Sequence, residues 1–571
     1  AQLCADREAV QDLGYYVDPE GAIYTAPGAE RPFSRLGARK AVLVDLSPAA
    51  TFIAYNYNTP VDVVAFEREA RRVLRAVEEE CDWMYETWHP HCDHPQRVKG
   101  RINYTIWSDV FLCSECGREM VFWNVAIDKK EGKICDPFYC LGCGTKQHKR
   151  DLERAWETTY DYALGHTVRH AKQVPVIVNY SLGKNRYEKQ PDAEDLGTIR
   201  KIENDDIPYK FPTDAIPPGD KTSDPLSTGI THIHHLYTQR NLWVLATMWD
   251  KAKALAESAR SIMMFAITAA MRHLTRMSKL GTTYYFHGGG GAINAGILGT
   301  LYIPSFSAEN NVLRTMGIRL PKLFRTLSRN PVLGDIIIST QSAGDEVRPF
   351  QDFVDYIFVD PPSGGNFMSS KLNFLWEAWF RLFTNNLPEA IVNRTQSKGL
   401  LEYQHLMEQC FQKFYKVLKP GRWMTVEFHN SRNNVWNAIQ EALLRAGFVV
   451  ADVRTFDKRQ GTFNQVTATG SVKQDLIISA YKPWVSFEHR FLKQAGTKDG
   501  AWSFVRQHLA QLPVAVRQDG ALEVVAERQP YLLFDRMVAF HLQRGATVPL
   551  SAAEFYAGLR ERFVERDGMY F

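Results

Sequence analysis

The chain has 571 residues, of which 45% are hydrophobic and 23% charged, and its formal net charge is +4. This length is too great for one hydrophobic core, so we expect three or more structural units. The composition is that of a soluble globular protein, and no apolar run is long enough to span a membrane. Nine cysteines, four of them in paired knuckles, favour metal binding in a reducing, cytoplasmic setting over disulfides.

A short apolar strand is predicted at residues 41–45, ending in Asp45 and followed by a helix start at Ser47 and Pro48. In doubly wound folds that bind nucleosides, an acid at the end of the second strand accepts hydrogen bonds from ribose hydroxyls. Asp45 fits that role, although the pattern also suits an ordinary acid at a helix N-terminus. The glycine-rich turn that should precede this strand is missing, so we expect the chain to be a fragment of a longer protein.

Two C-x2-C knuckles, each followed by a glycine, lie at Cys113–Cys116 and Cys140–Cys143. Between them, residues 120–127 have the composition of a strand. This layout predicts a zinc ribbon, in which four thiolates surround one tetrahedral ion and leave no open position. The zinc would therefore be structural, and it would supply folding energy that so small a unit lacks. Cys135 is an alternative ligand. We expect the upstream cluster of His89, His91, Cys92 and His94 to be loop residues.

Residues 151–330 have a pattern of helices and loops without a catalytic signature. Three histidines, His232, His234 and His235, precede an apolar helix predicted at 241–255. Their spacing does not place two of them on one helical face at i and i+4, so we predict no metal site there. Loops are predicted at 279–294 and 305–311.

From residue 331 the α/β pattern returns. A buried strand is predicted at Ile336–Thr340, with Ser342 just beyond its end. A second buried strand, Tyr356–Val359, ends abruptly in Asp360-Pro361-Pro362. A double proline cannot continue a ladder, so the chain must turn out at the carboxyl end of the strand, where open α/β sheets bind ligands. A carboxylate beside rigid carbonyls suits an amino group that is about to lose a proton. A helix is predicted at 372–383.

The Asp-Pro-Pro motif, the string SSKLNFLWEAW at 369–379, Thr384-Asn-Asn386 and Lys398-Gly-Leu together resemble the adenine-specific DNA methylases that carry a zinc ribbon. The resemblance covers most of the chain. It implies S-adenosylmethionine as cofactor and methylation of the exocyclic amino group of adenine in double-stranded DNA, with the base flipped out. It also implies a restriction-modification or phage-defence setting, with subunits of such systems as partners, and no membrane. The implied cofactor-binding residues are Asp45, Ser47, Ser342 and Asp360, and the implied catalytic residues are Asp360, Pro361 and Pro362.

One position departs from that family. The residue after the second proline is usually aromatic and stacks on the target base, whereas here it is Ser363. Either Phe367 supplies the stacking face, or activity is altered or lost. The alternatives are therefore a catalytically impaired, methylase-like protein that binds nucleic acid, or a methyltransferase that acts on RNA or on the amino group of cytosine.

The expected fold class is α/β: a doubly wound methyltransferase sheet whose last strand is antiparallel. The expected parts are a first part of the core at 1–84, a zinc-ribbon insertion at 85–150, a mixed insertion that could recognise DNA at 151–330, the catalytic half of the core at 331–484, and a small helical C-terminal unit at 485–571.

Overall fold

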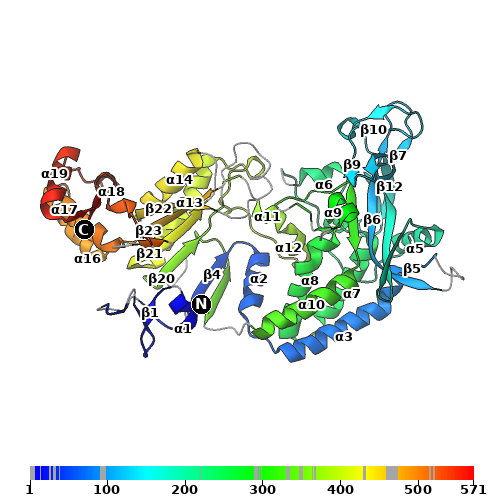
Figure 1. Cartoon of the computed structure of the whole chain (residues 1–571), viewed down its shortest axis with the longest axis horizontal. Helices are drawn as coiled ribbons and strands as arrows, with labels where there is room; N and C mark the ends of the chain where they lie inside the picture. The colour runs from blue at the N-terminus through cyan, green and yellow to red at the C-terminus, as the bar shows by residue number, and fades with distance from the viewer. Residues whose placement is uncertain are drawn as a thin grey trace. The chain divides into compact units, whose positions relative to one another are not determined.

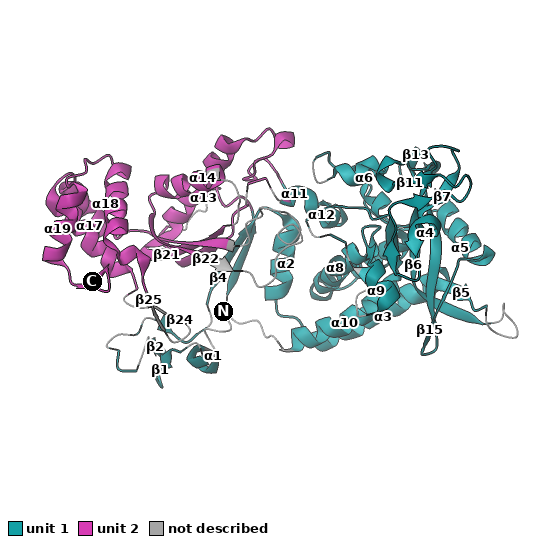
Figure 2. Cartoon of the chain, turned by 45° about the horizontal axis from the view of Figure 1, so that its top comes forward, with its two compact units in different colours: residues 1–340, 369–384 teal, residues 341–368, 385–571 magenta. Residues whose placement is uncertain are grey.

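The computed structural model describes residues 7–571 except 13, 25–26, 30–31, 33, 38, 91–97, 220–221, 289–292, 295, 298, 330–334, 346–350, 363, 366–367, 429–432, 458–473, 514–515 and 519–520. The chain forms two compact units (Figure 2). Unit 1 consists of residues 1–340 and 369–384, and unit 2 of residues 341–368 and 385–571. Among the described residues, no helix combines the length and apolar character that crossing a bilayer requires.

Unit 1 contains a helical core in which long amphipathic helices pack side by side (Figure 1). The first of them, α3, begins where the Asp62 carboxylate accepts the backbone N–H of Ala65, and it buries an apolar stripe at helical spacing. The helices of this core are α3 (Val63–Cys81), α7 (Gln239–Lys253), α8 (Glu257–Met271), α10 (Val312–Arg329) and α12 (Phe374–Phe380).

An eight-stranded sheet lies beside this core, built around the long strand β6 (Lys99–Leu112). Strands β14 (Gln173–Leu182) and β18 (Phe306–Asn310) flank β6, both antiparallel to it. The remaining strands are β5 (Glu86–Trp88), β7 (Glu119–Val121), β15 (Asn185–Lys189), β16 (Lys279–Leu280) and β17 (Ile293–Asn294). Residues 151–330 therefore contribute strands as well as the helices and loops that their sequence predicts, and they share one sheet with the strand that leads into the cysteine knuckles.

Unit 1 also contains a pair of parallel strands, β4 (Ala41–Asp45) and β19 (Ile336–Thr340). Helix α2 (Pro48–Asn58) follows β4 in the chain. The Thr51 hydroxyl of α2 lies 2.6 Å from that of Thr340. The prediction that β19 is buried is wrong, because its side chains are half-buried or exposed. Among the described residues β19 pairs only with β4, so its other edge has no strand partner there.

Unit 2 holds a four-stranded sheet in the order β20-β21-β23-β22. Strand β20 (Val354–Val359) is parallel to β21 (Leu418–Phe428), whereas β23 (Gln474–Tyr481) is antiparallel both to β21 and to β22 (Val449–Asp457). The predicted antiparallel last strand is confirmed. Helices α13 (Leu400–Val417) and α14 (Asn433–Arg445) contribute to the core over this sheet, and α14 ends near Gly447, whose φ of +100° suits glycine.

Strand β20 is not buried as its apolar composition predicts. Tyr356 and Phe358 are 54% and 58% exposed, while Ile357 and Val359 pack against the core of unit 2. The strand alternates because successive side chains point to opposite faces, and only one face of β20 is covered among the described residues.

After the sheet, unit 2 ends in a second apolar cluster made by helices. Aromatic side chains dominate it, including the stacked rings of Trp502 and Phe555. Its helices are α16 (Val485–Lys493), α17 (Lys498–Gln511), α18 (Pro530–Gln543) and α19 (Ala552–Arg562).

Candidate active site and metal centre

The two cysteine knuckles have the same local geometry. In each, the first cysteine accepts a backbone hydrogen bond from the glycine four residues later, at 3.0 Å for Gly117 to Cys113 and 2.9 Å for Gly144 to Cys140. Both glycines have positive φ, +68° and +73°, which a side chain would strain. These tight turns aim each pair of thiols in one direction, so local sequence fixes half of the site in each knuckle.

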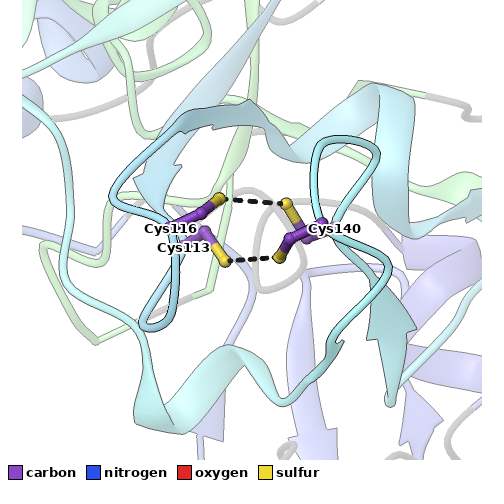
Figure 3. A group of neighbouring side chains, drawn as sticks. Cys113, Cys116 and Cys140 are labelled. Atoms are coloured by element: carbon purple, nitrogen blue, oxygen red, sulfur yellow. Dashed lines mark hydrogen bonds between the residues drawn. The ribbon is translucent and has the colours of Figure 1, made fainter.

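The two knuckles face one another and bring four sulfurs together (Figure 3). The sulfurs of Cys113 and Cys143 are 3.6 Å apart, those of Cys116 and Cys140 are 3.8 Å apart, and all four lie within 4.8 Å of one another. Four ligands at about 2.3 Å from a tetrahedral zinc ion would be separated by about 3.8 Å. The donor set and its spacing therefore fit a zinc ion.

Hydrogen bonds around the knuckles favour the thiolate at two of the four cysteines. At Cys116 the backbone N–H of Arg118 lowers the pKa, but burial and the neighbouring thiols outweigh it and raise that pKa to about 11. The Thr145 hydroxyl and backbone lower the pKa of Cys143 to about 6, and backbone N–H groups of Cys143 and Gly142 lower the pKa of Cys140. Hydrogen bonds to a charged form stabilise that form, and a thiolate is the form that binds metal.

The alternative ligands considered from the sequence do not join this cluster. Cys135 lies outside the four-sulfur group. His89 lies in a loop just after β5, as predicted, and it is buried there with its Nδ1 2.8 Å from the Tyr180 hydroxyl. His91, Cys92 and His94 lie outside the described residues.

The segment between the knuckles differs from its prediction as a strand. After β7 it forms a short helix, α4 (Phe122–Ala126). Phe122, Trp123 and Ala126 are buried on one side of it, where Phe122 contacts the rings of Phe111 and Phe306. Tertiary packing of these aromatic rings overrides the strand propensity of the segment.

The Asp-Pro-Pro turn lies at the carboxyl end of β20, as predicted. Asp360 is exposed and Pro361 is buried beneath it. The Pro362 carbonyl accepts hydrogen bonds from the hydroxyl of the fully buried Tyr403, at 2.8 Å, and from the backbone N–H of Gly364, at 2.9 Å. Both lone pairs of this carbonyl are thus engaged, and they fix the turn. A substrate amino group would have to use Asp360 and the Pro361 carbonyl instead.

Asp45 lies at the carboxyl end of β4, opposite Thr340 of β19. Its Oδ1 accepts the backbone N–H of Ser47 at 2.8 Å, which orients an otherwise exposed carboxylate. Because the group is exposed and fixed, it could accept hydrogen bonds from a ribose.

Ser47 is used within the protein. Its buried hydroxyl donates to Glu377 Oε1 at 2.6 Å and accepts from Asn373 Nδ2 at 2.9 Å and from the backbone of Ala50. Glu377, which sequence reasoning did not single out, also accepts the hydroxyl and backbone N–H of Thr384. A glutamate in the middle of an apolar string is the signal that could have revealed it. Ser47 and Glu377 therefore hold segment 369–384 in unit 1.

The remaining predicted residues lie in unit 2. The Ser342 hydroxyl is buried and accepts the backbone N–H of Gly344 at 3.1 Å, which makes a local turn. Ser363 and Phe367 lie outside the described residues.

The helix predicted at 372–383 is two helices, α11 (Ser369–Leu372) and α12, and α12 stops at Arg381, whose φ is +57°.

Comparisons with known proteins give limited similarities. No protein-family model and no curated protein matches the chain. The 16S rRNA (adenine(1408)-N(1))-methyltransferase from Catenulisporales acidiphilia is 13% identical over 26% of this chain and 63% of its own, with a TM-score of 0.16. A SAM-dependent methyltransferase from Methanosarcina mazei is 12% identical over 28% of this chain and 77% of its own, with a TM-score of 0.16. The chain thus spans less than two thirds of the first of these. The chain's own strand order and turn define an α/β protein with a candidate site at the end of β20.

Proposed function

We propose that this chain is an S-adenosylmethionine-dependent methyltransferase that acts on the exocyclic amino group of adenine in DNA. The observation that carries the proposal is the position of Asp360, exposed at the carboxyl end of a parallel strand and followed by a turn that Tyr403 fixes. This is the end of an open α/β sheet at which ligands bind. The resemblance of the surrounding sequence to zinc-ribbon DNA methylases supplies the substrate class.

Asp360 would act by orientation and charge. Its carboxylate accepts a hydrogen bond from the amino group, which aims the nitrogen lone pair, and it stabilises the positive charge that develops on that nitrogen before a proton leaves. The Pro361 carbonyl is the second acceptor, because the Pro362 carbonyl is already engaged. S-adenosylmethionine, when bound, supplies an activated methyl group.

The direct test is methyl transfer from labelled cofactor to DNA by the full-length protein and by its Asp360→Ala variant. Loss of a charge-assisted hydrogen bond in the transition state should lower the rate about a hundredfold, which corresponds to about 3 kcal/mol. Asp355→Ala is the matched control, because Asp355 lies on the same strand but pairs with Lys419 at the surface. Undiminished transfer by Asp360→Ala would rule out the proposed role.

The same assay separates the competing substrates. DNA, RNA and DNA that contains no adenine in either strand are compared as methyl acceptors, and transfer to RNA alone would overturn the DNA proposal. Ser363→Tyr restores the aromatic ring found in the resembled family. If missing base stacking limits activity, this variant should gain up to about tenfold, within the ~1–3 kcal/mol that one stacked base contributes. If the wild-type protein binds DNA but only the Ser363→Tyr variant transfers the methyl group, the wild-type protein is a catalytically impaired methylase.

We further propose that the four-cysteine cluster holds a structural zinc ion. The double variant Cys113→Ser/Cys140→Ser should lose one equivalent of zinc, and amides at 113–147 should exchange their hydrogens rapidly, because the metal supplies much of the local folding energy. Cys135→Ser is the control, since Cys135 lies outside the cluster. Zinc retained by the double variant would contradict the assignment.

A further inference from the structure

Unit 1 contains a cavity of about 1070 Å³ that the proposed methyl transfer does not use. Titratable side chains from separate elements line it, among them Glu157, Asp161, Glu203, His234, His235 and Arg276. A cavity of this size is comparable with the larger small-molecule sites in proteins, where a few polar groups fix the orientation of the ligand.

Three of these residues converge on one point. The Nε2 atoms of His234 and His235 lie 2.8 and 2.7 Å from the same oxygen, Oδ2 of Asp161. All three side chains line the cavity, and each offers a ligand atom within 4.8 Å of the other two. Two ligands at about 2.1 Å from one ion and at right angles would be separated by about 3.0 Å, close to the two histidine–aspartate distances.

The backbone fixes both sides of this group. Asp161 ends strand β12 (Trp156–Asp161), and its other oxygen, Oδ1, accepts the N–H groups of Ala163 and Leu164 at 2.9 and 3.1 Å. This leaves Oδ2 directed at the histidines. Carboxylates that bind metal ions are commonly held in place by further hydrogen bonds of this kind.

The two histidines lie in a 3₁₀ turn, η3 (Ile233–Leu236). In such a turn residues i and i+3 lie above one another, and Ile233 and Leu236 are both buried in the core of unit 1. His234 and His235 therefore occupy the remaining sides of the turn and reach Asp161 together.

In this structure Nε2 of each ring donates to the Asp161 carboxylate, which can only accept. A metal ion at the same point would replace these two protons, and each ring would then carry its proton on Nδ1. Nδ1 of His234, a residue with 7% of its surface exposed, has no hydrogen-bond partner, and Nδ1 of His235 has contacts only at 3.4 Å, with the hydroxyl and the backbone nitrogen of Thr231. Because neither Nδ1 accepts a strong hydrogen bond, the proton can move to Nδ1 when a metal ion takes its place at Nε2.

We propose that Asp161, His234 and His235 form a second metal centre, which binds a divalent transition-metal ion through two imidazole nitrogens and one carboxylate oxygen. Imidazole ligands suit zinc, iron and nickel, whereas magnesium and calcium prefer oxygen. Three protein ligands leave coordination positions open, and these face the cavity. The centre would thus hold a polar ligand in that cavity through an exchangeable position, unlike the closed cysteine site.

Metal content per chain tests the proposal independently of methyl transfer. The full chain is incubated with zinc or cobalt(II), freed of excess metal by gel filtration, and analysed by mass spectrometry of the elements. We expect two equivalents in the wild type and one in His235→Ala and Asp161→Ala. The matched control His232→Ala should keep two, because the Nδ1 of His232 contacts the Thr231 hydroxyl and the residue is not part of the three-ligand group.

The cysteine variant provides the reciprocal arm. Cys113→Ser/Cys140→Ser should keep one equivalent, and its cobalt(II) spectrum should lack sulfur charge-transfer bands, since imidazole and carboxylate are then the only ligands. Circular dichroism reports whether each variant folds. If a histidine variant fails to fold, the metal content of the cysteine variant still decides the question. Absence of metal from the folded cysteine variant, or equal metal content in the wild type and His235→Ala, would overturn the proposal and leave a hydrogen-bonded triad.

Discussion

Units 1 and 2 both bury charged side chains, yet they satisfy them in opposite ways. In unit 1, Asp161 and its histidines face a cavity, and their ligand atoms meet one another. In the helical part of unit 2, Arg528 is 2% exposed and its guanidinium donates to four backbone carbonyls at 2.8–3.0 Å. The carbonyls belong to Leu509, Leu512, Pro513 and Tyr570.

The difference distinguishes structural charge from charge that can bind a ligand. Every hydrogen bond of Arg528 ties one segment of the chain to another, so removing it should affect stability alone. The side chains of Asp161, His234 and His235 face the cavity. Removing one of them should therefore affect ligand binding more than stability. Four predictions follow this contrast, from the largest effect on stability to the smallest.

Replacing Arg528 with methionine should destabilise the helical part of unit 2 by about 3–5 kcal/mol. The side chain keeps its length but loses every donor, and buried carbonyls are left unpaired. Hydrogen exchange in α17 and α18 should become about 10²–10³ times faster, as local opening dominates exchange there. Exchange rates within threefold of the wild type would mean that Arg528 does not hold this region together.

Acid should weaken the same region through His508. Burial, with the positive charges of Arg536 and Arg528, lowers the pKa of His508 to about 3 in the folded state. The unfolded chain binds this proton near pH 6.5, so the stability is complete above pH 6.5 and is lost as the pH falls towards 3. At pH 5 the loss should be about 2 kcal/mol.

The variant His508→Gln isolates that effect, because glutamine does not titrate while nearby Glu527 remains. Exchange in α17 is compared at pH 7 and pH 5 after correction for intrinsic rates. The wild type should be weakened more than the variant by the amount stated. Equal pH dependence in the two proteins would show that His508 is protonated in the folded state.

Replacing His235 with alanine should destabilise unit 1 by only about 1 kcal/mol, the net value of one hydrogen bond. Asp161 keeps its bonds to His234, Ala163 and Leu164, so no buried charge is abandoned. The unfolding of unit 1 in urea, followed in metal-free buffer, measures this. A loss as large as that of Arg528→Met would place these cavity side chains among the structural charges.

The smallest effect should come from Lys498→Ala. Lys498 pairs with Glu554 at 3.0 Å, but both side chains are more than half exposed, so the pair should contribute less than about 0.5 kcal/mol. Exchange in α17 and α19 should hardly change, which makes this variant the baseline for Arg528→Met. A change of 2 kcal/mol or more would show that surface ion pairs, too, hold this region.

The cysteine cluster and the Asp-Pro-Pro turn were predictable because short-range rules position them. Glycine after each knuckle and a double proline after an apolar strand constrain the backbone within a few residues. The exposure of β19 and β20 was not predictable from their apolar composition, because it depends on which neighbours cover each face. Helix α4 was not predicted either, because the packing of its aromatic side chains against neighbouring elements determines its structure.

The Asp161 group shows where prediction from sequence stops. Its carboxylate is 73 residues from His234 along the chain, so no local spacing connects them. The histidines were tested against α-helical spacing, whereas the segment forms a 3₁₀ turn in which adjacent residues can act together. The meeting of these side chains therefore depends on contacts that only the folded chain creates.

The division of the chain has a consequence for the order in which it is made. The backbone passes between the units three times, at 340/341, 368/369 and 384/385. The second segment of unit 1, residues 369–384, contributes four side chains to the core of that unit: Phe374, Leu375, Ala378 and Trp379. During synthesis from the N-terminus, that core is therefore incomplete until residue 384 has left the ribosome. By then strand β20 and Asp360 already exist, but β21, β22 and β23 do not, so β20 must wait unpaired while the core of unit 1 is completed.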